Sequence, residues 1–328
     1  MSEGKHLIAG LEGLHAAVVA CVGDLMLDRF VYGEVQRISP EAPIPVLSIQ
    51  SQQSMLGGLG NVVRNLGSLG CAIRLFSITG DDAPAGEIAD LLDQVPDCQV
   101  FLLKEAARKT PVKIRYIAHS QQLLRADHET TNEASPKIAA QLVEHFRHQV
   151  EQCTVVLLSD YAKGVLKGSH TRELIATAQA AAKPVVVDPK GHDFERYVGA
   201  TVITPNLKEL GEATGMPTSN ADAQSSAARV LLERTSAEFL LVTRGPAGML
   251  LVPREGHETE FPSLAKEVYD VSGAGDTVVA VLAAALGSGT GIIEAVELAN
   301  IAAGIVVGKV GTAVASRVEI SREVAERS

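Results

Sequence analysis

Short runs of β-branched residues alternate with longer helical segments along most of this chain, and this alternation constrains its fold more than any other feature. Strands that alternate with helices are joined by right-handed crossovers and form a mostly parallel sheet with helices on both faces. The sequence therefore predicts an α/β fold. The expected strands are 17–22, 155–158, 184–187, 201–203 and 239–242, and the expected helices are 138–150, 171–181, 221–233 and 294–307.

Two stretches, residues 29–50 and 110–127, depart from this rhythm. Polar and apolar residues alternate in both, and the first also contains Pro40, Pro43 and Pro45. Such alternation is typical of antiparallel strands with one exposed face. We predict a single domain over residues 1–328, in which these two insertions form a small, half-exposed antiparallel β lid.

The charge balance excludes several functional classes. The chain has 29 Lys and Arg against 39 Asp and Glu, a formal net charge of −10, whereas proteins that coat nucleic acids or membranes need a basic face. No apolar run reaches the roughly 18 residues of a membrane-spanning helix, and no secretory signal is visible. The four scattered cysteines form no C-x-x-C pair, as expected in a reducing compartment. We expect a cytoplasmic protein that binds small molecules and neither nucleic acid nor membrane.

The sharpest local signal is residues 270–277, DVSGAGDT, which precede a long apolar run. Gly273 and Gly275 allow a tight turn, and the helix that follows points its free N–H groups and positive dipole end at that turn. This combination favours an anion site. Asp276 lies beside it, where a carboxylate can accept a proton from an attacking hydroxyl. From this segment alone, an acidic residue of an ordinary first helical turn explains Asp276 equally well.

A second glycine-rich segment spans residues 57–70, with Gly57 and Gly58 just before Asn61 at the start of an expected helix. The glycines allow a ligand to approach the backbone closely. A dinucleotide fingerprint is incomplete because Val63 takes the place of its third glycine, and no P-loop pattern occurs. Alone, this segment is a weak signal.

Together, residues 57–70, 79–82 and 270–276 resemble the two signatures of the ribokinase-like (phosphofructokinase B) carbohydrate kinases, in the same order and at similar spacing. The resemblance covers essentially the whole chain. It implies transfer of a phosphoryl group from ATP to a sugar hydroxyl, with ATP and Mg²⁺ as cofactors. It also implies a three-layer α/β/α domain with a mostly parallel central sheet and a small β-sheet lid.

The resemblance also implies roles for individual residues. Asp276 matches the catalytic base, and Gly273, Ala274 and Gly275 match an anion hole for the transferred group. Alone, Asn206 and Glu209 are more typical of a helix cap and a solvated side chain. By resemblance, Glu209 would hold magnesium, directly or through water. The nucleotide side would comprise Lys190, Asn206, Lys208, Glu209, Thr243, Gly245, Gly248 and Asn300, and the acceptor side Asp28, Gly57, Gly58, Asn61, Arg108 and Lys163.

Four further segments, residues 37–46, 108–115, 159–164 and 188–191, are similar to the heptose 7-phosphate kinases of lipopolysaccharide precursor synthesis. Those enzymes phosphorylate the C1 hydroxyl of D-glycero-β-D-manno-heptose 7-phosphate to give the 1,7-bisphosphate. Many are fused to a nucleotidyltransferase, whereas this chain ends at residue 328, so a stand-alone kinase is expected. The resemblance also suggests a homodimer joined through the lid.

Basic residues in these segments fit a phosphorylated acceptor. Two phosphate groups in one cleft need local positive charge on an otherwise acidic protein. We expect Lys190 near the phosphates and Arg108 or Lys163 on the acceptor phosphate, although a single Lys or Arg is usually just solvated. Arg125, Asp127 and Glu129 are expected to form an exposed network at the edge of the lid. The full basic set is Arg108, Lys109, Lys113, Arg115, Lys163 and Lys190.

Two alternatives stay open at this stage. The acceptor could be another sugar or sugar phosphate, such as a ketohexose phosphate. The chain could also be a catalytically silent regulator that binds sugar or nucleotide on the same fold. A nicotinamide dehydrogenase, a metal hydrolase and a serine hydrolase have little support, because the motifs of all three classes are missing or incomplete.

Overall fold

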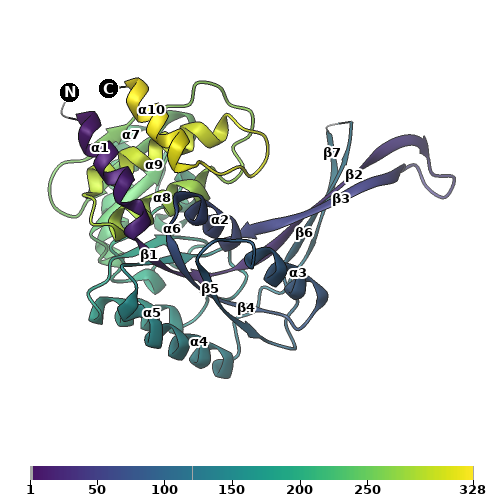
Figure 1. The fold of residues 1–328 in the computed structure, drawn as a ribbon, viewed down its shortest axis with the longest axis horizontal. Coiled ribbons are helices and arrows are strands. Elements are labelled where there is room, and N and C mark those ends of the chain that lie inside the picture. The colour runs from purple at the N-terminus through teal and green to yellow at the C-terminus, as the bar shows by residue number, and fades with distance from the viewer. Residues whose placement is uncertain (1–2, 120, 328) are drawn as a thin grey trace.

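The computed structural model describes residues 3–119 and 121–327 and is organised around a large sheet (Figure 1). The strand order is β13-β12-β11-β10-β9-β8-β1-β4-β5. The neighbouring strands β11, β10, β9, β8, β1, β4 and β5 run parallel to one another. Strands β12 and β13 continue the sheet as antiparallel strands. The strands are β1 Val18–Gly23, β4 Ala72–Thr79, β5 Cys98–Lys104, β8 Val155–Ser159, β9 Val185–Asp188, β10 Val202–Ile203, β11 Phe239–Thr243, β12 Met249–Pro253 and β13 Thr259–Phe261.

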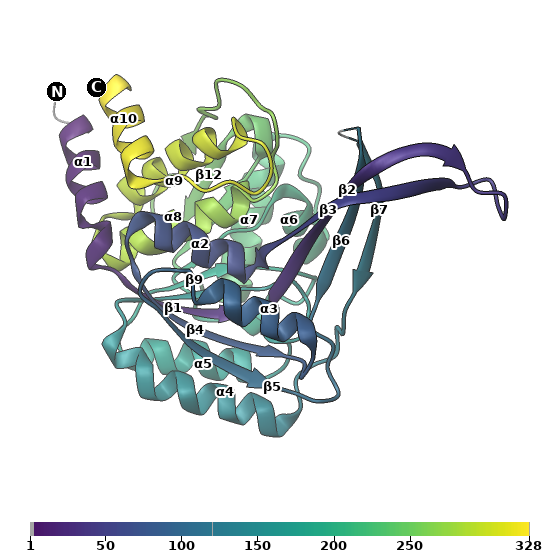
Figure 2. The ribbon, with the colours of Figure 1, turned by 45° about the vertical axis from the view of Figure 1, so that its right-hand side comes forward.

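Helices cover both faces of this sheet, as Figures 1 and 2 show. One face carries α1 (Glu3–Gly13), α2 (Leu59–Leu69), α3 (Ala83–Leu92), α8 (Ala274–Gly287), α9 (Ile292–Val307) and α10 (Arg317–Arg327). The other carries α4 (Pro136–Gln149), α5 (His170–Ala180), α6 (Leu207–Thr214) and α7 (Ala221–Thr235).

The central strand β1 shows why the sheet is buried between two helical layers. Val19 and Cys21 join the apolar core under one layer, and Ala20 and Val22 join the core under the other. Because successive side chains of a strand point to opposite faces, a strand that is apolar throughout needs cover on both sides. The predicted α/β fold is confirmed, and the ends of each expected strand and helix agree to within two residues.

A second, smaller sheet forms the lid, with the order β3-β2-β6-β7. Its strands are β2 Leu25–Ile38, β3 Pro45–Gly58, β6 Val112–Ala118 and β7 Gln121–His128. The β2–β3 hairpin extends away from the body of the protein (Figure 2).

The lid differs from the expected antiparallel flap in its central pair. Strands β2 and β3 are antiparallel, as are β6 and β7, but β2 and β6 run parallel. The reason lies in the connection. The chain returns through α2, β4, α3 and β5 before it forms β6, and such a long crossover allows a parallel neighbour, whereas a short hairpin allows only an antiparallel one.

None of the helices within residues 3–119 and 121–327 is both long enough and apolar enough to cross a membrane.

Candidate active site

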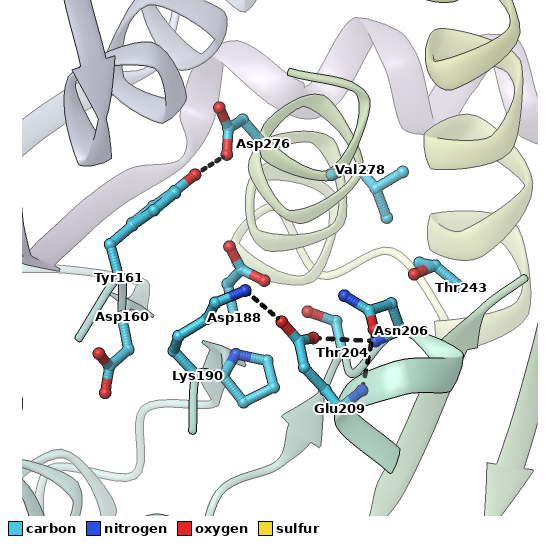
Figure 3. A pocket seen from close by; sticks show the side chains of 12 residues that line it. Asp160, Tyr161, Asp188, Lys190, Thr204, Asn206, Glu209, Thr243, Asp276 and Val278 are labelled. Carbon is cyan, nitrogen blue, oxygen red and sulfur yellow. Dashed lines mark hydrogen bonds and ion pairs between the residues drawn. The ribbon is translucent and has the colours of Figure 1, made fainter. Parts of the chain in front are cut away.

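A cavity of about 170 Å³ lies at the carboxyl ends of β8, β9, β10 and β11, beside the start of α8 (Figure 3). In open α/β sheets, ligands bind at this edge. The cavity brings together six residues that the sequence analysis singled out: Lys190, Asn206, Glu209, Thr243, Gly275 and Asp276. The other residues that line it are Asp160, Tyr161, Asp188, Pro189, Thr204 and Val278.

Asp276 lies in the first turn of α8, which begins after Gly273. Gly273 has a φ of 80°, in the left-handed region that favours glycine, and a Cβ there would lie 2.7 Å from Nδ2 of Asn61. At Gly275, by contrast, a Cβ would meet nothing within 4 Å. The start of α8 thus combines a position that tolerates only glycine with an open backbone that faces the cavity.

Both oxygens of the Asp276 carboxylate accept a hydrogen bond. The Tyr161 hydroxyl donates to Oδ1, as Figure 3 shows, and Asn61 Nδ2 donates to Oδ2 at 2.7 Å. Arg64 Nη1 donates to Asn61 Oδ1 at 3.3 Å, which orients the Asn61 amide with its nitrogen toward Asp276.

The pKa of Asp276 is raised to about 6, chiefly by burial and in part by the charge of Asp28, although the hydrogen bonds from Tyr161 and Asn61 lower it. A carboxylate with this pKa is still ionised at pH 7, yet it is a stronger base than an ordinary aspartate. This suits proton abstraction near neutral pH.

The nucleotide-side residues meet at the start of α6. Asn206 Oδ1 accepts the Glu209 N–H at 2.9 Å, and Glu209 Oε2 accepts the Asn206 N–H at 3.0 Å, a reciprocal capping box. The second Glu209 oxygen, Oε1, accepts a hydrogen bond from Lys190 Nζ at 2.8 Å (Figure 3). Asn206 therefore caps helix α6, as its residue type alone suggested. The same cap fixes Glu209 at the wall of the cavity.

The carboxylates that line the cavity are suited to binding a cation that enters together with an anionic ligand. Burial raises the pKa of Asp188 well above its ordinary value, and the charges of Asp276 and Glu209 add to this. Among the described residues, no group of three or more His, Cys, Asp or Glu is placed to hold a metal ion. Mg²⁺ needs no such cage, because it keeps several waters and binds substrate phosphates plus one or two carboxylates. Asp188 and Glu209 fit that donor set.

The acceptor-side residues come from the base of the lid. Asp28 on β2 is buried, and its Oδ1 accepts a hydrogen bond from Arg115 Nη1 of β6 at 2.7 Å. A Cβ on Gly57 would overlap the Asp28 carboxylate, and a Cβ on Gly58 would lie 2.7 Å from a backbone carbonyl. Gly57 therefore lets β3 approach Asp28 closely, and Gly58 lets it approach the backbone of Asp24. Asp28 lies near enough to Asp276 for its charge to act on the Asp276 pKa.

A second cavity, of about 440 Å³, lies between α9 and the segment that follows β13. Asn300 on α9 is buried, and its Nδ2 donates to the Pro262 carbonyl at 2.8 Å, so this amide helps to fix that segment. Gly248 lets the turn after β11 approach the same segment, and a Cβ on Gly245 would meet nothing within 4 Å. The cavity is lined by Leu264, Lys266, Glu267, Ile301, Gly304, Ile305, Gly308 and Glu323.

Among the expected site residues that line neither cavity, three have charged side chains that bind other parts of the chain: Arg108, Lys163 and Lys208. Arg108 is buried, and its guanidinium binds Glu105 Oε2 and the carbonyls of Lys163 and Asn132 at 2.7–2.9 Å. Lys163 Nζ pairs with Glu129 Oε1 at 2.7 Å. Lys208 is exposed and pairs with Glu212 one helical turn away. The cationic groups of Arg108 and Lys163 thus bind other parts of the chain, and the structure brings neither of them to the wall of a cavity.

Several residues that shape the site were not singled out individually from the sequence: Tyr161, Asp188, Asp160 and Asp24. Three of them occur in segments whose similarity to heptose 7-phosphate kinases was noted, 159–164 and 188–191. Two of them could have been found from the sequence, because Asp160 and Asp188 stand at the carboxyl ends of parallel strands. An acidic residue in that position is a candidate site residue. Nothing in the sequence indicated that Tyr161 meets Asp276.

Known proteins resemble this chain at the levels of sequence and structure. The profile of the pfkB family carbohydrate kinases matches residues 16–318. The bifunctional protein HldE of Paramagnetospirillum magneticum is 51% identical over 315 residues, which cover 96% of this chain and 64% of the relative. HldE of Rhodospirillum rubrum is 51% identical over 295 residues, 90% of this chain and 60% of the relative. The chain thus spans less than two thirds of the length of these relatives.

Solved structures share the fold at low sequence identity. Ribokinase of Arabidopsis thaliana, complexed with ribose and ATP, matches with a TM-score of 0.74 and 20% identity, covering 94% of this chain and 98% of that one. Phosphofructokinase-2 of Escherichia coli, in complex with potassium, matches with a TM-score of 0.78 and 21% identity over the same shares of the two chains. The expected ribokinase-like architecture is confirmed.

Proposed function

This chain belongs to the pfkB family of carbohydrate kinases, and from that premise we propose that it transfers the γ-phosphoryl group of ATP to a hydroxyl of a sugar phosphate. The acceptor we propose is D-glycero-β-D-manno-heptose 7-phosphate, phosphorylated at its C1 hydroxyl for lipopolysaccharide core precursor synthesis. One observation carries the reaction type. A carboxylate with a pKa of about 6, Asp276, lies at the start of a helix beside a cavity that also holds Lys190 and Glu209.

In the proposed mechanism, Asp276 accepts the proton of the attacking hydroxyl. The N–H groups at the start of α8, from Gly273 to Gly275, face the transferred group, where the positive end of the helix dipole stabilises its negative charge. Lys190 neutralises phosphate charge at the opposite wall. Asp28 and Asn61 orient the acceptor. Closure of the lid excludes water, which would otherwise hydrolyse ATP.

The nucleotide occupies both cavities in this proposal. Its triphosphate lies along Thr243, Asn206 and Lys190, and its adenosine lies in the larger cavity beside α9, where Leu264 and Ile305 offer apolar surface. Glu209 and Asp188 would hold Mg²⁺, partly through water. Bound Mg²⁺ supplies charge neutralisation on the phosphate oxygens.

A phosphorylated acceptor is supported by three cations on the lid: Lys113, Arg115 and Arg125. We call them the basic face of the lid. In the register of the sheet, Lys113 stands opposite Asp28 of β2, and Arg115 stands opposite Arg125 of β7. Cross-strand partners and residues two apart lie on the same face, so these cations share the face of Asp28.

The charges on this face do not balance. Asp28 pairs with Arg115, and Asp127 pairs with both Lys113 and Arg125. Three cations therefore share two carboxylates, which leaves room for an anionic ligand. Neighbouring strands lie about 4.8 Å apart and successive residues of a strand about 3.3 Å apart. Arg125 is two strands away from Asp28 and two residues along, so the two positions lie about 12 Å apart. An acceptor whose phosphate is remote from its reacting hydroxyl would fit this separation.

Arg125→Gln is expected to raise the KM for the sugar phosphate about tenfold while leaving the KM for ATP unchanged, because one charge-assisted bond to phosphate is lost. Arg147→Gln on α4 is the matched control, since Arg147 is an equally exposed arginine in a single ion pair, with Glu173. Steady-state kinetics with both substrates measures the two constants. An unchanged acceptor KM in Arg125→Gln would remove the basic face from acceptor binding.

An acceptor panel tests the proposed function itself. ADP release is measured with heptose 7-phosphate, ribose, fructose and fructose 6-phosphate, and the product is mapped by phosphorus NMR. We expect the highest kcat/KM with heptose 7-phosphate and a new phosphate at C1. Preference for fructose 6-phosphate would identify a ketohexose phosphate kinase instead. Absence of any sugar-dependent ADP release would identify a silent binding protein and overturn the proposal.

We also propose a homodimer joined through the lids. The β2–β3 hairpin, which extends from the body, exposes Ile38, Ile44 and Ile49, and a second lid would cover these side chains. Sedimentation analysis tests this arrangement. A cytoplasmic location completes the proposal. It is supported by the availability of ATP there and by the four cysteines, which are free thiols as expected in a reducing compartment.

A further inference from the structure

The hydroxyl of Tyr161 contacts Asp276 at the wall of the cavity. Tyr161 belongs to the loop between β8 and α5, and 115 residues separate it from Asp276 in the chain. Its hydroxyl donates to Oδ1 (Figure 3). Asn61 Nδ2 of α2 donates to the other oxygen, Oδ2. The carboxylate thus accepts hydrogen bonds from α2 and from the β8–α5 loop, two elements that are far apart in the sequence.

Two buried carboxylates accept hydrogen bonds from the backbone of the loop that carries Tyr161. The buried carboxylate of Asp24 accepts the backbone N–H groups of Tyr161, Lys163 and Val165 at 2.9–3.0 Å. Asp160 accepts the N–H of Ala162 at 2.7 Å, and Ala162 has a φ of 56°, which is unfavourable for a residue other than glycine. Local strain of this kind persists where the surrounding structure holds it in place, and it clusters at functional sites.

The charges around Asp276 oppose its ionisation. The charged groups that face it are Asp28 on β2 and Asp188 at the end of β9, and both are acidic. The direct partners from α2 and from the β8–α5 loop, Asn61 and Tyr161, are neutral donors. Burial raises the pKa of the Tyr161 phenol well above its ordinary value, so the phenol stays protonated and can only donate to Asp276.

We propose that Tyr161 is a positioning residue that keeps the Asp276 carboxylate ionised and directs one of its oxygens toward the acceptor hydroxyl. Each carboxylate oxygen has two lone pairs, so the phenol and the acceptor hydroxyl can share Oδ1. In the reaction the acceptor O–H bond breaks and its proton moves to Asp276. The acceptor oxygen forms a bond to the γ-phosphorus, and the bond to the leaving ADP breaks with its electron pair on ADP. Tyr161 keeps its own proton throughout. This role rests on the proposed function.

Tyr161→Phe tests the role, because it removes the hydroxyl and keeps the ring. Loss of a hydrogen bond to an ionised group should move the acid limb of the kcat/KM–pH profile upward by roughly one to two pH units. Activity should fall about three- to 25-fold at pH 6.5, as a shift of one to two units from a pKa of about 6 implies, and recover largely at pH 8.5. A role confined to packing would lower activity equally at all pH values.

Tyr197→Phe is the matched control. Tyr197 is also a buried tyrosine whose hydroxyl donates to a buried carboxylate, Asp160 Oδ2, at 2.7 Å. We expect its acid limb to keep the wild-type midpoint, whatever its effect on stability. A wild-type midpoint in Tyr161→Phe would overturn the inference. If wild-type protein showed no acceptor-dependent ADP release, the proposed function would fail instead, so the two failures are distinguishable.

Discussion

Asp276→Asn should lower kcat by about 10²- to 10⁴-fold, the usual loss when a general acid or base is removed. The KM for ATP should change little, because an asparagine at this position would keep the shape of the side chain at the start of α8, and the N–H groups there do not depend on its charge. Coupled detection of ADP with the best acceptor of the panel gives both constants.

The same substitution should leave the fold as stable as the wild type or make it more stable at pH 7. Burial raises the pKa of Asp276 from 3.8 to about 6, so the folded state binds the proton more tightly than the unfolded state. The resulting stabilisation is complete below pH 4 and is lost as the pH rises through 6. At pH 7 the ionised group therefore costs about 3 kcal/mol, by the conversion of a pKa shift to free energy. Asparagine removes that charge, at the expense of one accepted hydrogen bond.

Asp222→Asn is the control for Asp276→Asn. Asp222 lies in the first turn of α7, is exposed and lies outside the cavity. If Asp276 served only as an acidic residue of a first helical turn, both variants would behave alike, with small losses of stability and normal turnover. Near-normal kcat in Asp276→Asn would exclude Asp276 as the base.

Asp24→Ala should lower the free energy of unfolding by about 3–5 kcal/mol, because three N–H groups, one buried and two partly buried, lose their acceptor at once. Asp24 is 1% exposed, and its oxygens accept the amides of Tyr161, Lys163 and Val165. Activity should fall as well, since the loop that aims Tyr161 at Asp276 loses its support. Urea unfolding at pH 7 measures the first effect and ADP release the second.

Two further variants keep this prediction testable. Asp24→Asn retains one side-chain acceptor and should lose an intermediate amount of stability, which can be measured even if Asp24→Ala does not fold. Asp81→Ala removes an exposed partner of Lys104 and should change the unfolding free energy by at most about 1 kcal/mol. A loss below about 1 kcal/mol in Asp24→Ala would show that the loop holds its shape without this carboxylate.

Sequence reasoning succeeded where the signal is local. The glycine turn before Asp276, the Asn206–Glu209 cap and the Gly57–Gly58 pair each depend on residues a few positions apart. Backbone geometry then determines where they lie, because an open parallel sheet brings the carboxyl ends of its strands to one edge. For this reason the carboxyl ends of the strands indicated where the site lies, and the resemblance to carbohydrate kinases assigned Lys190, Thr243 and Asp276 to it.

Sequence reasoning could not foresee which partner a long charged side chain contacts. Arg108 and Lys163 are basic residues near the site in sequence, yet the fold uses one to bind carbonyls and the other to pair with Glu129. A flexible cation can reach several partners, and the choice among them depends on atoms that distant segments bring within about 3 Å. The local pattern of polar and apolar residues does not indicate which distant segments these are.

The sequence by itself determined the α/β architecture and the family, because the alternation of strands and helices and the glycine–aspartate motifs are properties of contiguous residues. Only the tertiary structure decided that Tyr161 and Asn61 grip the two oxygens of Asp276, and that Lys113, Arg115 and Arg125 share the face of Asp28. These contacts join residues 87 to 215 positions apart along the chain, as the pairs Arg115–Asp28 and Asn61–Asp276 show. Proximity of that kind arises from packing and strand register, and no short stretch of sequence encodes it.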